Sequence, residues 1–440
     1  MRKIAFIGAG SLGFTRNLVN DLLTFPAFAD AEFCLMDIDK ERLEGIEKCC
    51  RRIVEASGKP AKITTTLSRK EALLGADGVL CTVFNGDIDI WRYDIEIPKK
   101  YGVDTNIGDT RSVSGIFRAL RNIPLLLDIC KDIEAYCPNA VFLNYTNPMS
   151  ILCKAMQTYT KVDVTGLCHS VQHTVQLLAN WMEMPVEDID YLCAGVNHQA
   201  FYLKLEKEKQ DLYPKLREKM KDEYIYNQEI VRNNMFLNLD YYVTESSGHN
   251  SEYNQWYRKR PDLIEKYCTP GTGWNPGEYA YSLKMRLERV DNWKQEVETW
   301  LKEHPADTYK LERTVEYAAD IFNARFGDNT PFQFNGNVIN EGCIPNLPYD
   351  ACVEIPVIAD RAGFHKMHVG ELPAHLAILV NTTARMENLV VEAAMEKSKR
   401  KVFHAVCMDP LTSAVLTLDE IQQMVDELFE ANKEFLGDYK

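Results

Sequence analysis

The stretch that decides the fold lies at the amino terminus, where residues 3–13 are KIAFIGAGSLG. Its apolar half, Ile4–Ile7, is typical of a buried strand, and the apolar spacing over residues 16–23 predicts a helix. Between them, three glycines in a GxGxxG pattern permit a tight turn and the close approach of a pyrophosphate, which the positive end of the helix dipole stabilises. Strand, glycine turn and helix in this order predict a dinucleotide-binding unit.

An acidic residue after the second predicted strand supports the same site. The apolar run 32–36 leads into Asp37, which follows Gly13 by 24 residues. This is near the spacing of about 20 at which a carboxylate hydrogen-bonds the ribose hydroxyls of a dinucleotide. A carboxylate here repels a 2′-phosphate, so NAD is favoured over NADP. The residues expected to bind NAD are Gly8, Gly10, Ser11, Gly13 and Asp37.

Short apolar runs alternate with helical patterns through the first 170 residues, which predicts an α/β fold with a Rossmann-like, doubly wound parallel sheet. The expected strands are residues 3–7, 32–36, 62–66, 78–83, 141–144 and 164–167. The expected helices are residues 16–23, 40–56, 70–74 and 116–136. We assign residues 1–195 to an NAD-binding domain.

The pattern changes beyond about residue 200. The later segments are charged helical stretches at 204–223, 262–267 and 279–303, short extended runs at 335–360 and a helical region at 380–436. We expect residues 196–440 to form a C-terminal α+β domain that contributes to the substrate and metal site and to oligomerisation. No linker rich in Pro, Gly or Ser separates the halves, so we expect tight packing with a cleft between them.

Charge and cysteine content narrow the classes of partner and compartment. Fifty basic and 64 acidic side chains give a net charge of −14, so we expect neither a nucleic acid nor a membrane as partner. No run reaches the ~18 apolar residues that span a bilayer, and the first apolar run is too short for a signal peptide. Thirteen cysteines without a CxxC pair fit a reducing compartment. We expect a cytoplasmic location.

Polar residues follow the carboxyl ends of three predicted strands. In doubly wound sheets, ligands bind at the carboxyl ends of the strands. These residues are Asn147 after the run 141–144, Cys168 and His169 after 164–167, and Asn197 and His198 after 194–196. A thiolate and an imidazole suit a borderline-soft divalent metal, and two protein ligands leave positions open for a chelating substrate. From spacing alone, the alternative is that Cys168 is a small buried apolar residue and that His198 is hydrogen-bonded without binding a metal.

At these residues the chain resembles family 4 of the glycoside hydrolases and, within it, the α-galactosidase branch. The matching motifs cover essentially the whole chain and are FIGAGS at 6–11, LMDID at 35–39, LNYTNPM at 143–149, GLCHSVQ at 166–172, NH at 197–198, VTESS at 243–247, NLP at 346–348 and GELP at 370–373. The resemblance implies NAD, Mn²⁺ or another divalent metal, a glycoside substrate, and a homodimer or homotetramer.

The resemblance also implies roles for single residues. Cys168 and His198 are implied as metal ligands. Asn147 and Asn197 are expected to contact the sugar, and His169 occupies the place of a proton donor.

The base for the proton on sugar carbon 2 is expected within residues 242–252, because relatives draw their base from this stretch. We expect His249, whose imidazole ordinarily titrates near ~6.5 and can accept and return a proton at neutral pH. Glu245 and Glu252 remain alternatives. Asp109 is expected to orient a sugar hydroxyl or the leaving-group proton, or else to cap the helix that begins near Ser112.

Two positions depart from the pattern of the family. After Asp109 and Thr110 the chain has RSVSG at 111–115 in place of a glycine-rich turn, and Gly248 stands where an acid is usual. Arg111 is expected to bind the substrate, which favours an anionic sugar such as a uronide. A solvated surface position for Arg111 is the alternative.

The resemblance implies hydrolysis of an unphosphorylated α-glycoside, with an α-galactoside favoured, by a route outside the usual two-carboxylate scheme. NAD-dependent oxidation at sugar carbon 3 acidifies the proton on carbon 2, so that elimination across carbons 1 and 2 becomes possible. Addition of water and re-reduction complete the reaction. An α-glucoside or a uronide is the alternative substrate. A simple NAD-dependent dehydrogenase and a non-catalytic NAD-binding sensor are the alternative functions.

Overall fold

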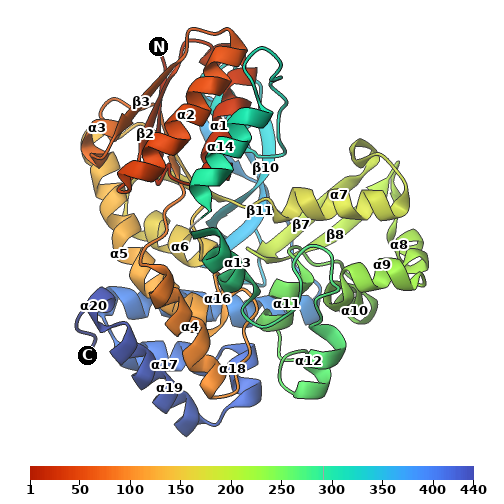
Figure 1. Cartoon of the computed structure of the whole chain (residues 1–440). Coiled ribbons are helices and arrows are strands. Elements are labelled where there is room, and N and C mark those ends of the chain that lie inside the picture. The colour runs from red at the N-terminus through yellow and green to blue at the C-terminus, as the bar shows by residue number, and fades with distance from the viewer. Residues whose placement is uncertain (291) are drawn as a thin grey trace.

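The computed structural model describes residues 1–290 and 292–440, which form one mixed β-sheet with helices on both faces (Figure 1). The strands are β1 (Lys3–Ile7), β2 (Glu32–Met36), β3 (Lys62–Thr66), β4 (Gly78–Cys81), β5 (Val141–Asn144), β6 (Asp163–Leu167), β7 (Asp190–Val196), β8 (Gln199–Lys207), β9 (Gln210–Asp211), β10 (Phe332–Ile339), β11 (Cys352–Asp360) and β12 (Gly363–Lys366).

The helices of the first half are α1 (Leu12–Thr24), α2 (Lys40–Ser57), α3 (Arg69–Leu73), α4 (Ile88–Lys100), α5 (Ser112–Tyr136), α6 (Met149–Tyr159), α7 (Ser170–Met182), α8 (Tyr213–Lys219), and the 3-10 helices η1 (Pro26–Phe28) and η2 (Val186–Asp188). Those of the second half are α9 (Glu223–Gln228), α10 (Ile230–Leu239), α11 (Ser247–Tyr253), α12 (Pro261–Tyr267), α13 (Tyr281–Val290), α14 (Trp293–Glu303), α15 (Ala318–Phe326), α16 (Ala374–Glu396), α17 (Lys399–Cys407), α18 (Pro410–Val415), α19 (Leu418–Ala431) and α20 (Lys433–Leu436).

The amino-terminal half of the sheet is parallel, in the order β3-β2-β1-β4-β5-β6. Successive residues of β1 enter opposite faces: Ile4 and Phe6 belong to one apolar cluster, and Ala5 and Ile7 to the other. Because both faces are covered, the inner strands β1, β4 and β5 are almost continuously apolar, whereas the edge strand β3 (KITTT) is mostly polar and partly exposed. The predicted Rossmann-like fold is confirmed, with strand ends shifted by no more than two residues.

An antiparallel extension brings the ends of β6 and β7 together. The sheet continues from β6 through β10 and β11 to β7, and each of these pairings is antiparallel. One row of paired residues crosses it, from Gly166 through Asn337 and Glu354 to Gly195. The segments that follow β6 and β7 therefore meet, although β7 runs opposite to β6.

Strands β10 and β11 come from the second half of the chain, so one sheet crosses the predicted domain division at residues 195 and 196. Helices also cross it: α14 packs on α2, and α16, α17 and α19 pack on α4, α5 and α6 (Figure 1). No helix within the described ranges 1–290 and 292–440 is long and apolar enough to cross a membrane.

Two predictions for the second half need correction or restriction. The predicted helix 204–223 is wrong at its start, because residues 204–207 continue strand β8, which pairs with β7. Pairing across a hairpin outweighs the local helical pattern. The predicted helical stretch 279–303 contains α13 and α14, and its residue 291 lies outside the described part of the chain.

Candidate active site

The glycine turn after β1 packs so tightly that side chains do not fit. The N–H groups of Gly8 and Ala9 donate to the carbonyl of Met36 at 3.0 and 2.9 Å. Gly8 has a φ of +83°, and a Cβ there would lie 2.8 Å from the carbonyl oxygen of Thr82. The glycine therefore lets the ends of β1, β2 and β4 converge on one point.

The Asp37 carboxylate lies beside this turn and accepts hydrogen bonds from the backbone. Its Oδ2 accepts from the N–H of Gly10 at 2.7 Å, and its Oδ1 accepts from the N–H of Asp39 at 2.9 Å. A Cβ on Gly10 would lie 2.8 Å from Oδ2. Helix α1 starts next to the turn with Ser11 as its N-cap, and Gly13 in its first turn has open space around it. Helix N–H groups for a pyrophosphate and a carboxylate for a ribose thus adjoin, as NAD requires.

Three buried side chains from distant segments form a potential metal site. They are Cys168 after β6, His198 in the turn between β7 and β8, and Glu245 just before α11. One ligand atom from each lies within 4.8 Å of the others, and His198 Nε2 is 3.2 Å from Glu245 Oε2. Sulfur, imidazole nitrogen and carboxylate oxygen together suit a divalent transition metal such as Mn²⁺.

The backbone at two of these residues is strained. His198 has a φ of +60° and Glu245 a φ of +67°, a left-handed region that residues other than glycine seldom adopt. Such conformations cluster at functional sites, because surrounding contacts must hold them. The sequence motifs predict Glu245 only as an alternative base, not as a metal ligand. The signal for it was a carboxylate four residues before His249.

The electrostatics of the cluster also suit a metal. Burial lowers the pKa of His198 to about 4, so its imidazole is neutral and keeps a lone pair. The Tyr253 hydroxyl is 3.1 Å from its Nδ1, the kind of contact that orients a metal-binding histidine. Burial opposes ionisation of Glu245, but His198 and His249 lower the pKa of that carboxyl. Burial raises the pKa of the Cys168 thiol well above its usual range, so metal binding there would release a proton.

His249 lies in the first turn of α11 and contacts both Glu245 and Asp109. Its Nδ1 is 2.7 Å from Ser246 Oγ and 3.3 Å from Glu245 Oε1, and its Nε2 is 3.7 Å from Asp109 Oδ1. Burial disfavours the imidazolium, but Glu245 and Asp109 raise the pKa of His249 to about 9. The expectation that His249 titrates near its ordinary value is therefore wrong, because two carboxylates face one ring.

Asp109 joins His249 to Asn147. Its Oδ2 accepts from the Asn147 side-chain amide at 3.4 Å, and its Oδ1 accepts from the Thr110 hydroxyl at 2.8 Å. Burial opposes ionisation, but the hydrogen bond and charge of His249 hold the pKa of Asp109 well below its usual range. The alternative that Asp109 caps the following helix is wrong, because Arg111 is the N-cap of α5.

His169 lies on the more open side of the cluster, with 35% of its side chain exposed. Its Nδ1 is 3.5 Å from Glu316 Oε1, and its ring stacks on Phe14. Burial favours the neutral ring, but the hydrogen bond and charge of Glu316 raise the pKa of His169 above its ordinary value. Glu316 lies in a loop without a sequence motif, so no local pattern predicts its contact with His169.

Glu252 holds a loop. Its two carboxylate oxygens accept backbone hydrogen bonds from Asn106, Ile107 and Gly108 at 2.7, 2.9 and 3.0 Å. These bonds fix the segment that leads into the aspartate facing His249 and leave Glu252 poorly placed as a base. A Cβ on Gly248 would lie 2.3 Å from Asn106 Oδ1, so this unusual glycine makes room for Asn106.

Arg111 and Asn197 lie in a buried layer behind His198. Arg111 is 3% exposed, and its Nε is 3.4 Å from Glu387 Oε1. The surface alternative for Arg111 is therefore wrong. The Asn197 side chain donates to Glu354 Oε1 at 3.4 Å. The structure thus separates these two residues from the exposed side of the cluster, where His169 lies.

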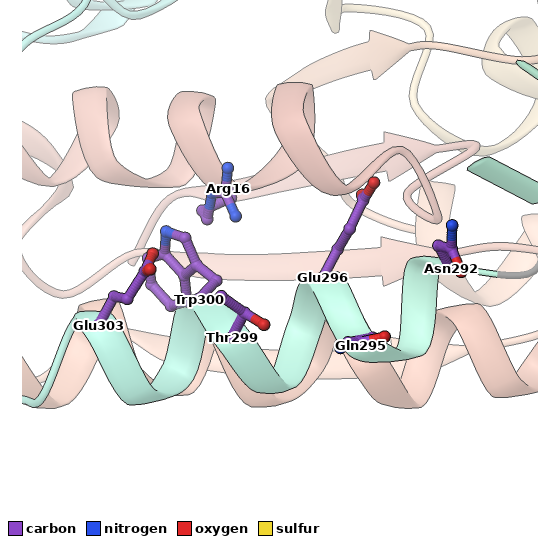
Figure 2. A pocket seen from close by; sticks show the side chains of 7 residues that line it. All are labelled: Arg16, Asn292, Gln295, Glu296, Thr299, Trp300 and Glu303. Atoms are coloured by element: carbon purple, nitrogen blue, oxygen red, sulfur yellow. The ribbon is translucent and has the colours of Figure 1, made fainter. Parts of the chain in front are cut away.

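A surface depression of about 560 Å³ lies elsewhere, between α1 and α14 (Figure 2). Its lining consists of Arg16, Asn292, Gln295, Glu296, Thr299, Trp300 and Glu303. The Arg16 guanidinium stacks over the Trp300 ring, 4.8 Å from its centroid. These residues do not overlap the predicted site, so the depression is not the candidate active site.

Comparisons with known proteins match the whole chain. A model described as family 4 glycosyl hydrolase matches residues 3–184, and one described as family 4 glycosyl hydrolase C-terminal domain matches residues 193–412. An α-galactosidase of Bacillus subtilis (strain 168) is 38% identical over 446 residues, which cover 100% of both chains. An α-galactosidase of Rhizobium meliloti (strain 1021) is 37% identical over 99% of this chain and 89% of its own.

A solved structure supports the fold. A 6-phospho-α-glucosidase from gut microorganisms, in complex with NAD and Mn²⁺, superposes with a TM-score of 0.82. It is 21% identical to this chain and covers 100% of both chains. At this identity the likeness establishes the shared architecture.

Replacing Cys168 tests the metal cluster. We expect Cys168→Ser to weaken Mn²⁺ binding strongly and to abolish most activity, because a neutral hydroxyl is a poorer ligand than a thiolate. Titration of Mn²⁺ followed by electron paramagnetic resonance measures the affinity. Cys193→Ser, at another buried cysteine, controls for the loss of a buried thiol. Full Mn²⁺ affinity and activity in Cys168→Ser would exclude the thiol as a ligand.

Asp37 gives a separate test of the dinucleotide site. We expect Asp37→Ala to weaken NAD binding about tenfold or more, because it removes both the ribose acceptor and the bond that shapes the glycine turn. Isothermal titration calorimetry measures the affinity. Asp39→Ala is the matched control, since Asp39 caps α2 through the N–H of Arg42 and its loss costs stability of about 1 kcal/mol. Equal NAD affinities in Asp37→Ala and the unmodified chain would refute the assignment.

Proposed function

The chain belongs to family 4 of the glycosyl hydrolases, and we propose that it hydrolyses an unphosphorylated α-glycoside, preferentially an α-galactoside, with NAD and a divalent metal. The curated α-galactosidase of Bacillus subtilis supports this substrate class, because it aligns over the full length of both chains at 38% identity. The single observation that carries the proposal is the buried cluster of Cys168, His198 and Glu245 beside His249 and Asp109.

The residues around the two cofactor sites fit the groups expected there. Gly8, Gly10, Ser11, Gly13 and Asp37 would hold NAD, and Cys168, His198 and Glu245 would hold the metal. When bound, NAD supplies a hydride acceptor and the metal supplies a Lewis acid for the sugar hydroxyls. The relative that contains both NAD and Mn²⁺ supports this pairing of cofactors.

The side chains next to the cluster have complementary roles in the elimination. The proton on carbon 2 becomes acidic once carbon 3 carries a carbonyl. The neutral form of His249, which becomes more populated as the pH rises toward its pKa of about 9, accepts this proton at Nε2, the nitrogen that faces Asp109. The Asn147 amide and the ionised Asp109 hold sugar hydroxyls. A proton acceptor, His249 in α11, and hydrogen-bonding groups for the sugar, Asn147 and Asp109, thus lie beside the same cluster, and their mutual contacts fix their geometry.

The leaving group at carbon 1 needs a proton as its bond to the sugar breaks. His169, whose pKa the neighbouring Glu316 raises, supplies it from its protonated form, and the same ring then accepts a proton from the water that adds at carbon 1. Water reaches this part of the site because His169 is partly exposed. The direct displacement of other glycosidases needs two carboxylates flanking the bond, whereas here a histidine and a metal site flank it.

We also propose that the enzyme is a cytoplasmic homo-oligomer in which residues 1–195 bind NAD and residues 196–440 complete the substrate site. The free thiols of all thirteen cysteines in the described chain support a reducing compartment. An α-glucoside or a uronide would react by the same route. A simple dehydrogenase or an NAD-binding sensor would have no use for the buried ligand cluster.

The isotopic fate of carbon 2 tests the mechanism. We expect hydrolysis of an aryl α-galactoside in deuterated water, with NAD and Mn²⁺, to place deuterium at carbon 2 of the released sugar without net NADH. Mass spectrometry of the product measures this label. His249→Ala should suppress it, while Glu252→Gln retains the carbon 2 chemistry if it folds, since Glu252 serves the loop. Product without deuterium at carbon 2 would refute elimination, and stoichiometric NADH would indicate a dehydrogenase.

A further inference from the structure

Arg111 has contacts that neither solvent nor a sugar explains. The guanidinium donates from Nη2 to the carbonyl oxygen of Asn197 and pairs through Nε with Glu387 on α16. It also stacks over the ring of Tyr253, with its central carbon 4.8 Å from the ring centroid. All three contacts lie in the buried layer behind His198. Arg111 stands at the start of α5, and its side chain extends into this layer.

The contact with Asn197 acts on the backbone that carries His198. Asn197 and His198 form the two-residue turn between β7 and β8, and His198 adopts the left-handed conformation there. A non-glycine residue in that conformation needs surrounding contacts to hold it. A guanidinium bonded to the carbonyl that directly precedes His198 supplies such a contact.

The contact with Tyr253 acts on the imidazole itself. The Tyr253 hydroxyl is 3.1 Å from His198 Nδ1, and the two rings stack with their centroids 6.3 Å apart. The flat guanidinium packs against the tyrosine ring and restricts its rotation. Arg111 therefore reaches both ends of His198: the backbone through Asn197 and the ring through Tyr253.

Glu387 allows the positively charged Arg111 to lie near a bound metal cation. An unpaired guanidinium beside the cluster would repel a divalent metal ion. Glu387 is 4% exposed; burial raises its pKa to about 7, and the charge and hydrogen bond of Arg111 oppose that rise and favour the ionised pair. Glu354 and Asp409 lie close enough to interact with the same charge. A sugar carboxylate would have to enter this buried layer to reach Arg111, whose Nη1 is buried and has no hydrogen-bond partner among the described residues.

We propose that Arg111 is a positioning residue, held by Glu387, which fixes the turn at Asn197 and the ring of Tyr253 so that His198 Nε2 faces Glu245 and Cys168. The proposal rests on the proposed metal site. It gives the RSVSG segment a function of its own: the segment supports the metal ligand from behind. It also makes α16, in the C-terminal part of the chain, a support of the metal site.

The test compares Arg111→Gln with Arg111→Lys and a control. Arg121→Gln is the matched control, because Arg121 is a buried arginine on the same helix, paired with Asp94 at 3.0 Å and away from His198. Two quantities are measured on the folded full-length proteins: Mn²⁺ affinity by electron paramagnetic resonance, and the ring ¹⁵N shifts of His198 in the metal-free protein by NMR. A His198→Gln variant assigns the His198 signals.

We expect Arg111→Gln to weaken Mn²⁺ binding about tenfold or more, as loss of a supporting contact does at other metal sites, and to shift the His198 ring signals. Arg111→Lys should bind Mn²⁺ with intermediate affinity, since an ammonium reaches a carbonyl but does not stack as a plane. Arg121→Gln should lower the denaturation midpoint while the Mn²⁺ affinity and the His198 signals stay unchanged.

Unchanged Mn²⁺ affinity and His198 signals in Arg111→Gln would overturn the proposal. So would a loss of activity confined to aryl α-galacturonides, with Mn²⁺ affinity unchanged, because Arg111 would then be a substrate residue. If the unmodified protein binds no Mn²⁺, the proposed metal function fails, and the NMR comparison still decides on positioning: shifted His198 signals support it, and identical signals refute it.

Discussion

The buried carboxylate of Glu245, held between the imidazoles of His198 and His249, is the interaction on which the rest of the site depends. A carboxylate in a dry interior is costly unless positive charge lies beside it. His249 supplies one such charge, and a divalent cation shared with Cys168 would supply the other. The same side chain thereby links the metal half of the site to the half that transfers protons.

The architecture serves to bring these groups together. Cys168 follows a parallel strand, whereas His198 lies in an antiparallel hairpin, and the row from Gly166 through Asn337 and Glu354 to Gly195 joins the two. The amide of Asn337 donates to Gly166 and to Glu354 at 3.2 and 3.4 Å. These hydrogen bonds and the strand pairing join the strands that lead to the two ligands, so the sheet fixes the distance between Cys168 and His198.

The features that depend on local sequence patterns could be predicted from the sequence. The strands β1 to β6, the glycine turn and the strand-end residues Cys168 and His198 all follow from periodicity and motif. The position of Glu245 could not be predicted, because it depends on a left-handed backbone and on strands far away in the chain. Likewise Arg111 has its partner Glu387 276 residues away, and no local pattern indicates that pairing. Helices α4, α6 and α7 were not predicted; Pro98 inside α4 is a local signal against a helix, although α5 was predicted in spite of Pro124.

The most direct test of this account is anomalous diffraction from crystals of the full chain grown with NAD and Mn²⁺. We predict one strong manganese peak within about 2.0–2.6 Å of Cys168 Sγ, His198 Nε2 and a carboxylate oxygen of Glu245, with NAD density against the glycine turn. A peak bonded to other residues would contradict the account. So would an empty cluster in a protein that still hydrolyses α-galactosides after exhaustive removal of metals.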